Sequence, residues 1–93
     1  MPTIRYTRTK ARKALFNVLK EGRPCQDCRN VYPSVCMDWD HRPGSNKRSA
    51  VSVMIQQGLG EETILMEIAK CDLVCSNCHR IRTAARRQHK NAS

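Results

Sequence analysis

The sequence predicts one small α+β domain that is held together by a four-cysteine zinc site. With 93 residues, the chain has room for a single domain. Only 4% of the residues are aromatic, and so small a chain with so few large apolar side chains usually needs a metal or disulfides to fold stably. Six cysteines, four of them in two Cys-x-x-Cys pairs, supply such a cross-link. Helix-type and strand-type patterns both occur along the chain, which predicts the mixed fold.

Residues 1–23 are predicted to form a basic N-terminal helix. Between residues 9 and 21 the apolar side chains recur on one helical face, and Gly22 supplies a C-terminal stop. The other side of this helix is basic. It carries Arg12, Lys13 and Lys20.

Two short strands are predicted near the chemically interesting residues. Residues 35–39 are rich in strand formers and run into Asp40 and His41, after which residues 43–46 read as a turn. Residues 73–74 form a second short apolar strand. These strands are expected to build the β part of the fold.

Three further helices are predicted, with Ser49 as the N-cap of the first. They are expected over residues 50–57, over residues 61–70, and from residue 76 to residue 87 or 90. Acidic residues fill the first turn of the middle helix, where the helix dipole favours them. The zinc-held domain therefore spans residues 24–90, and residues 91–93 are expected to be a tail.

The charge distribution points to a polyanionic partner. The chain has 17 basic and 8 acidic residues, a net charge of +9, and a pI of about 9.7. The net charge is +6 over residues 1–24, −2 over residues 25–72 and +5 over residues 73–93. Two basic ends around a slightly acidic middle favour nucleic acid, although basic tails can also be merely solvated.

The sequence also bounds the cellular location. Its apolar runs are only a few residues long, which excludes a membrane span, and the basic N-terminus lacks the apolar stretch of a signal peptide. We therefore expect a reducing cytoplasm, that of a bacterial host if the gene belongs to a phage. In that compartment paired cysteines bind metal more often than they form disulfides.

The paired cysteines give the strongest signal. A two-residue spacer lets a tight turn place two sulfurs at about 2.3 Å from one Zn²⁺, and two such pairs complete a structural site. The four proposed ligands are Cys25, Cys28, Cys75 and Cys78. The alternative is a disulfide framework, which six cysteines could connect in about fifteen ways. Cys36 and Cys71 lack such spacing and are interpreted as buried small side chains.

Two histidines stand where hydrolytic chemistry would need them. Asp40 and His41 end a predicted strand, and His79 directly follows Cys78 on the last helix, about 100° around the axis from it. A carboxylate and an imidazole can bind a hard divalent ion, while a second imidazole can activate water. The third histidine, His89, is interpreted as a solvated side chain.

These motifs together resemble those of small zinc-containing HNH endonucleases encoded by bacteriophages and bacteria. The resemblance rests on the first Cys-x-x-Cys pair, the run WDHRPG at residues 39–44 and the run CDLVCSNCHRIRT at residues 71–83. It implies a ββα-metal, treble-clef-like core with flanking helices. It also implies that His41 is the general base, that Asp40 and His79 ligate a catalytic Mg²⁺ or Mn²⁺, and that the four cysteines hold a separate zinc.

The chain departs from the family at one position. The middle asparagine of the family commonly lies nine residues before the final histidine, where it braces the loop that carries the base. In this sequence Lys70 occupies that position, and Asn77 falls inside the second cysteine pair. The bracing role is therefore left without a residue.

The predicted function is metal-dependent cleavage or nicking of DNA. The candidate phosphate contacts are Arg82, Arg86, Arg42 and Lys47. Two alternatives fit the zinc and the charge: a non-catalytic Cys₄ DNA-binding module, and an accessory subunit of a phage DNA-packaging or recombination complex, for example beside a terminase. The first alternative leaves Asp40, His41 and His79 without an assigned role, whereas the second is compatible with nuclease activity.

Overall fold

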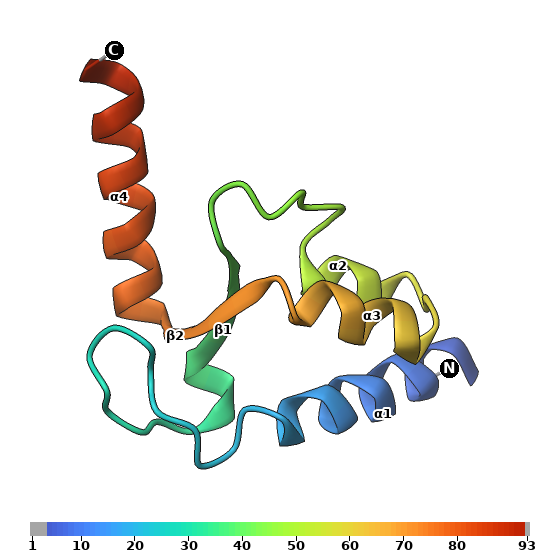
Figure 1. The fold of residues 1–93 in the computed structure, drawn as a ribbon. Coiled ribbons are helices and arrows are strands. Elements are labelled where there is room, and N and C mark those ends of the chain that lie inside the picture. Colours follow the sequence, from blue (N-terminus) through green and yellow to red (C-terminus); the bar gives the residue numbers. More distant parts are fainter. Residues whose placement is uncertain (1–3, 93) are drawn as a thin grey trace.

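The computed structural model of the chain describes the backbone of residues 4–92 and the side chains of residues 10–88. Its elements follow one another in the order α1 (Ile4–Val18), the 3₁₀ turn η1 (Ser34–Cys36), β1 (Met37–His41), α2 (Val51–Gln56), α3 (Glu61–Ile68), β2 (Cys71–Cys75) and α4 (Ser76–Ala92) (Figure 1). This mixture of four α-helices and two strands confirms the predicted small α+β domain.

The two strands form one antiparallel sheet, although 29 residues lie between them in the sequence. Met37 lies opposite Cys75 and His41 lies opposite Cys71, so the strands pair over their full length. Helix α4 follows β2 without a connecting loop and projects away from the sheet (Figure 1). This register places the end of β1, with Asp40 and His41, beside the start of β2.

The core consists of two apolar clusters on either side of Trp39. The first joins α1, α2 and α3 and contains Phe16, Val51, Met54, Ile55, Ile64 and Cys71. The second lies around the sheet and contains Cys25, Met37, Leu73, Val74, Cys75 and Cys78. Trp39 packs against both, as predicted for a core residue. Because three members of the second cluster are paired cysteines, that half of the core depends on what holds these sulfurs together.

The structure corrects several predicted element boundaries. β1 begins at Met37, not at Val35, because the N–H of Cys36 donates to the carbonyl of Pro33 and closes a 3₁₀ turn that leaves Val35 82% exposed. Ser49 does not cap α2, whose N-cap is Ala50 without a side-chain hydrogen bond.

The remaining elements differ in length from the predictions. α1 ends at Val18, before a series of turns, and β2 covers five residues where two were predicted. α4 continues to Ala92, into the predicted tail, because neither Gly nor Pro interrupts it. Residues 1–3 of the predicted N-terminal helix and Ser93 lie outside the described residues. Within the described part of the chain, no helix combines the length and apolarity needed to cross a membrane.

Candidate functional site

The four paired cysteines converge at the junction of β2 and α4. Cys75 ends β2 and Cys78 lies in the first turn of α4, while Cys25 and Cys28 come from the turn after α1. Their four sulfur atoms all lie within 4.8 Å of one another. Cys25 and Cys75 are buried, and Cys28 is the partly exposed member.

Backbone contacts shape the turn that carries the first pair. The N–H of Arg29 donates to the carbonyl of Cys25 at 2.9 Å, and Arg29 adopts the left-handed region with φ 66°. The N–H of Gln26 donates to the carbonyl of Leu73 at 2.8 Å, which fastens the turn to β2. The first pair is thereby brought to the second one, fifty residues further along the chain.

The donor set fits a structural metal ion. Four sulfurs around one Zn²⁺ with bonds of about 2.3 Å lie roughly 3.8 Å apart, which is compatible with the observed cluster. Two backbone N–H groups donate to these sulfurs, from Cys75 to Cys25 at 3.3 Å and from Cys78 to Cys75 at 3.4 Å. Burial opposes ionisation of Cys25, but such backbone hydrogen bonds outweigh it and lower its pKa, while the hydrogen bond with Cys75 raises the pKa of Cys78. Four sulfurs this close could therefore hold a cation such as zinc, which would compensate their shared negative charge.

The two unpaired cysteines stand outside this cluster, as predicted. Cys71 is buried at the start of β2, and its thiol donates to the carbonyl of Glu67 at 3.4 Å. Burial, and after it the negative charge of Glu67, raises the pKa of Cys71 to about 11. Cys36 is only partly buried, in η1. Cys71 therefore lacks the chemistry of a reactive thiolate, and the predicted burial holds for Cys71 but not for Cys36.

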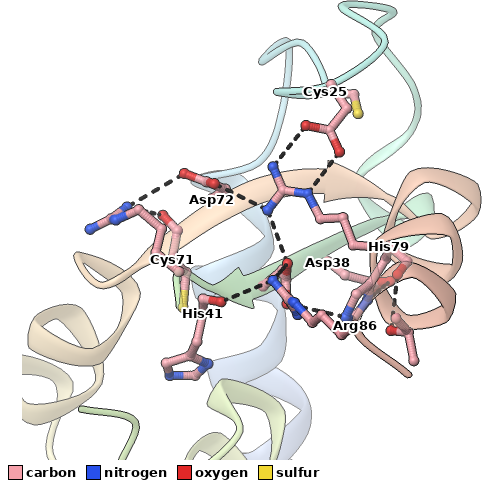
Figure 2. Close-up of polar contacts among 12 residues, drawn as sticks. Cys25, Asp38, His41, Cys71, Asp72, His79 and Arg86 are labelled. Atoms are coloured by element: carbon pink, nitrogen blue, oxygen red, sulfur yellow. Dashed lines mark hydrogen bonds and ion pairs between the residues drawn. The ribbon is translucent and has the colours of Figure 1, made fainter. Parts of the chain in front are cut away.

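A second polar cluster lies between β1 and the first turns of α4. His79 Nδ1 lies 3.0 Å from Asp38 Oδ2, and His79 Nε2 lies 3.5 Å from Asp40 Oδ1. Figure 2 shows Asp38 on the strand facing His79 on the helix. A carboxylate beside Nδ1 favours the tautomer with the proton on Nδ1, which leaves the Nε2 lone pair directed towards Asp40.

This pair of atoms fits a single divalent ion. Two ligands with bonds of about 2.1 Å to one cation lie about 3.0–3.5 Å apart, and the observed separation of His79 Nε2 from Asp40 Oδ1 falls in that range. The chain offers two donors here, so the remaining coordination positions would fall to water or to phosphate oxygens. Asp40 and His79, which the sequence predicts to ligate a catalytic ion, thus lie close to each other.

Arginines from α4 surround the same carboxylate. Arg86 donates to both oxygens of Asp40 at 2.9 Å, and Arg82 donates to Asp40 Oδ2 at 3.0 Å. Burial alone would raise the pKa of Asp40, but these hydrogen bonds outweigh it and hold the pKa below its usual value. A cation shared by Asp40 and His79 would have to replace the Arg86 contact with Oδ1.

Arg82 is the centre of a wider ion-pair network. Its guanidinium makes two contacts of 2.7 Å with Asp27 in the first cysteine turn and one of 3.1 Å with Asp72 on β2. Together with Asp40, three carboxylates share this one guanidinium, which raises the pKa of Arg82, chiefly through the hydrogen bond with Asp27. Arg82 therefore ties the cysteine turn, both strands and α4 together.

Arg42 is also engaged by the protein. It donates to the carbonyls of Ala69 at 2.5 Å and of Cys71 at 3.0 Å, and it lies 3.5 Å from Asp72. Among the four basic residues predicted to contact phosphates, Lys47 differs, because it is exposed and makes no ion pair with another described side chain. Arg42, Lys47 and Arg86 line one hollow beside Asp40 and His41, and Arg82 shares Asp40 with Arg86.

His41 contacts Glu67, a residue that no sequence pattern identifies. Its Nε2 lies 2.8 Å from Glu67 Oε2, on α3. Glu67 is 2% exposed, and it also accepts hydrogen bonds from the backbone N–H of Arg48 at 2.8 Å and from Lys70 Nζ at 2.9 Å. The hydrogen bond from Arg48, and less strongly those from Lys70 and His41, lowers the pKa of Glu67 to about 2. An ionised Glu67 favours the tautomer of neutral His41 that carries its proton on Nε2, in which Nδ1 has a lone pair that can accept a proton.

Lys70 stands where the resemblance to HNH endonucleases would place a bracing asparagine, and it contacts the loop after β1. Its Nζ donates to the carbonyl of Asn46 at 3.1 Å as well as to Glu67. The carbonyl of Lys70 accepts the N–H of Arg42 at 3.0 Å. Lys70 thus links the loop that follows His41 to the carboxylate that contacts His41. Asn77 is an exposed residue in the first turn of α4.

A cleft of about 380 Å³ opens between α1, β1 and α2 and reaches both polar clusters. Its wall includes Asp38, Asp40, His41 and His79. The indole Nε1 of Trp39, which also lines the cleft, has no hydrogen-bond partner among the described atoms. Figure 2 shows the ring of His41 pointing away from Arg86, so the two sides of the strand end present different chemistry.

Sequence analysis missed two residues of the site. Asp38 lies two positions before Asp40 on the same face of β1, a strand periodicity that could have identified it. Glu67 carries no comparable signal, because its contact with His41 crosses twenty-six residues and depends on how α3 packs.

The chain matches no protein-family model, no curated protein and no solved structure. Its described residues show a small α+β domain with a four-cysteine cluster that could hold a metal such as zinc. Two histidines, each in contact with a carboxylate, lie at the end of β1 and in the first turns of α4. The function is therefore inferred from this geometry and from the chemistry of these side chains.

Proposed function

We propose that the protein is a metal-dependent DNA endonuclease or nickase of the HNH type. One observation carries the proposal: Asp40 and His79, whose donor atoms lie 3.5 Å apart, line the same cleft as His41, whose Nδ1 can accept a proton in the Nε2-protonated tautomer. The order of β1, β2 and α4 supports an HNH-type, treble-clef-like ββα core. The residues of this core are those on which the resemblance to HNH endonucleases rests.

In the proposed reaction, His41 acts as the general base. Its Nδ1 takes a proton from a water molecule as the water oxygen attacks the phosphorus and the bond to the 3′ oxygen breaks. Glu67 holds the proton on Nε2 and stabilises the imidazolium that forms. The departing 3′ oxygen takes a proton from solvent, so the products carry a 5′-phosphate and a 3′-hydroxyl.

Asp40 and His79 would hold the catalytic Mg²⁺ or Mn²⁺. When bound, such an ion stabilises negative charge on the phosphate in the transition state. Asp38 orients His79 by accepting the Nδ1 proton, and Arg86, released from one oxygen of Asp40, is placed to contact the phosphate. The zinc of the four-cysteine site is structural, because a site with four protein ligands has no open position for substrate.

The substrate class follows from the charge. A net charge of +9, reduced to about +7 by four thiolates and one zinc ion, favours a polyanion such as DNA. The residues predicted to contact phosphates are Arg82, Arg86, Arg42 and Lys47.

Nicking of supercoiled plasmid in Mg²⁺ or Mn²⁺ tests the proposal. His41→Ala should reduce nicking by about 10²–10⁴-fold without loss of zinc, because a general base acts on water and does not hold the fold. His79→Ala should also abolish nicking, with partial recovery in excess Mn²⁺. His89→Ala is the matched control, since it removes the third histidine, and it should cut as wild type does.

Two results would contradict the proposal. One is a wild-type protein that nicks no form of DNA with any divalent ion, in which case the non-catalytic zinc module becomes the better description. The other is a His41→Ala variant that cuts as fast as wild type. Addition of EDTA to the wild-type reaction should stop cleavage at once, before the tightly held zinc leaves.

A further inference from the structure

Among the described exposed basic side chains that make no ion pair, unlike Arg82 and Arg42, four lie around the candidate cation site. They are Lys13 on α1, Lys47 in the loop after β1, and Arg80 and Arg87 on α4. None of them makes an ion pair or a side-chain hydrogen bond with another described residue. Cations without a carboxylate partner keep their full charge for a polyanion, whereas a paired guanidinium must first give up its partner.

These four residues line two hollows that meet at the candidate cation site. Lys13 and Lys47 line the cleft of about 380 Å³ between α1, β1 and α2. Arg80 and Arg87 line a second hollow of about 440 Å³ along α4. Asp38 and His79 belong to the walls of both hollows. The proposed cation site therefore lies between two pairs of uncommitted cations.

The spacing on α4 suits a nucleic-acid strand. Arg80 and Arg87 are two helical turns apart and lie on one face, about 10 Å along the axis. Phosphates of one strand of duplex DNA follow one another at about 3.4 Å along the duplex axis, so the two arginines span about three steps. Arg80 and Arg87 are both exposed, and the far half of α4 stands away from the sheet (Figure 1).

The described aromatic side chains favour duplex over single-stranded DNA. Binding of single strands usually relies on exposed aromatic rings on which bases stack. Phe16 is buried, and Tyr32 and Trp39 are partly buried in or against the core. Trp39 is the aromatic side chain of lowest burial in the lining of the two hollows, and it is partly buried, so we expect phosphate contacts to supply most of the affinity.

We propose that one duplex DNA lies across both hollows, with Arg80 and Arg87 contacting phosphates on one side of the cation site and Lys13 and Lys47 contacting phosphates on the other. This inference rests on the proposed function and specifies the substrate path for the same site. It assigns DNA contacts to α1 and to the outer face of α4. These contacts are separate from Arg82 and Arg86, which pair with aspartates.

Three double variants that each remove two positive charges test this path. They are Arg80→Gln with Arg87→Gln, Lys13→Gln with Lys47→Gln, and, as the control, Arg29→Gln with Arg48→Gln. Arg29 and Arg48 are exposed and line neither hollow. Binding of a fluorescent duplex of about 25 base pairs is measured against salt concentration without added Mg²⁺, on samples whose zinc content matches wild type.

Each hollow pair should lower the slope of log affinity against log salt by about 1.8, which amounts to roughly 60-fold in affinity at 0.1 M salt. The control pair should stay within about threefold of wild type. Equal losses in all three variants would show that net charge alone matters and would overturn the path. An unchanged slope in either hollow pair would overturn it as well.

The binding measurement is independent of catalysis. A protein that shows the expected pattern of slopes but never nicks DNA supports the path and contradicts the proposed function. The opposite outcome contradicts the path alone. In that case the protein nicks DNA through His41, but the control double variant loses as much affinity as the two double variants in the hollows.

Discussion

His41 Nε2 lies 2.8 Å from Oε2 of Glu67, and this contact joins the end of β1 to the last turn of α3. Both side chains are buried, His41 being 8% exposed and Glu67 3%. Glu67 also holds the loop after β1 through the N–H of Arg48 and through Lys70. A carboxylate in such a position fixes both the orientation and the tautomer of the imidazole.

We expect Glu67→Gln to reduce nicking by about 10–100-fold while the protein stays folded. The amide can still accept the N–H of Arg48, but it no longer supplies a negative charge opposite His41 Nε2, so the imidazolium formed in the reaction loses its partner. The single-turnover rate at saturating DNA measures this effect. Glu62→Gln, at an exposed position on the same helix, is the charge-matched control and should leave the rate unchanged.

The low pKa of Glu67 predicts a specific loss of stability in acid. Its pKa is about 2 in the folded protein, against an ordinary value near 4.5, because the N–H of Arg48 and then Lys70 and His41 stabilise the charged form. A group with a depressed pKa contributes stability above its unfolded pKa and loses that contribution as the pH falls towards its folded pKa.

The difference in melting temperature between wild type and Glu67→Gln should therefore be largest near neutral pH and shrink between about pH 4.5 and pH 2. Comparing two proteins removes the loss of zinc in acid, which both share. A difference that stays constant over this range would show that Glu67 is not ionised in the folded protein.

Lys70 is expected to support both Glu67 and the loop after β1. Lys70→Met keeps the aliphatic stem but removes the ammonium, which leaves Glu67 Oε1 and the carbonyl of Asn46 without a donor. This should lower the free energy of unfolding by about 1–3 kcal/mol and slow nicking, because the loop next to His41 is less restrained. Lys70→Arg retains a donor and should recover most of both losses. Equal activity of the two variants would argue against this bracing role.

The sequence predicts the parts of the site that local spacing determines. The two Cys-x-x-Cys pairs identify the sulfur cluster. The step of one residue from Cys78 to His79 separates the side of α4 that carries a sulfur of this cluster from the side that faces Asp40. Strand and helix periodicity likewise predict the mixed fold.

The residues that sequence analysis missed depend on contacts between distant elements. Glu67 meets His41 because α3 packs near the end of β1, and no local pattern records that contact. Arg82 lies on the predicted polar face of α4, but its three carboxylate partners come from the cysteine turn and from both strands. A side chain that binds phosphate and one that closes an ion-pair network look the same in the sequence.

Metal removal should unfold the half of the core that contains the cysteines. Cys75→Ser should lose the zinc and the cooperative thermal transition, because structural zinc contributes about 10–16 kcal/mol in small zinc modules. Cys36→Ser is the matched control, and it should keep one zinc per chain and melt near wild type. Metal analysis by mass spectrometry and thermal melting measure both outcomes. A purified protein with native disulfides among the four paired cysteines and no zinc would rule out this site.

Arg82 should matter first for stability. Its guanidinium is 19% exposed and serves Asp27, Asp40 and Asp72 at once, so Arg82→Gln leaves the buried Asp40 with one fewer cation. Loss of one partner from a fully buried pair costs about 3–5 kcal/mol, but Asp27 and Asp72 are 37% and 24% exposed, and solvent screens them. We therefore expect a loss of about 2 kcal/mol, or about 10 °C in melting temperature. Arg80→Gln, two residues earlier on the exposed side of α4, should cost less than about 0.5 kcal/mol. Equal melting temperatures for the two variants would contradict the role of Arg82 in the ion-pair network. DNA affinity measured on the same folded, zinc-loaded samples separately tests the phosphate contact predicted for Arg82.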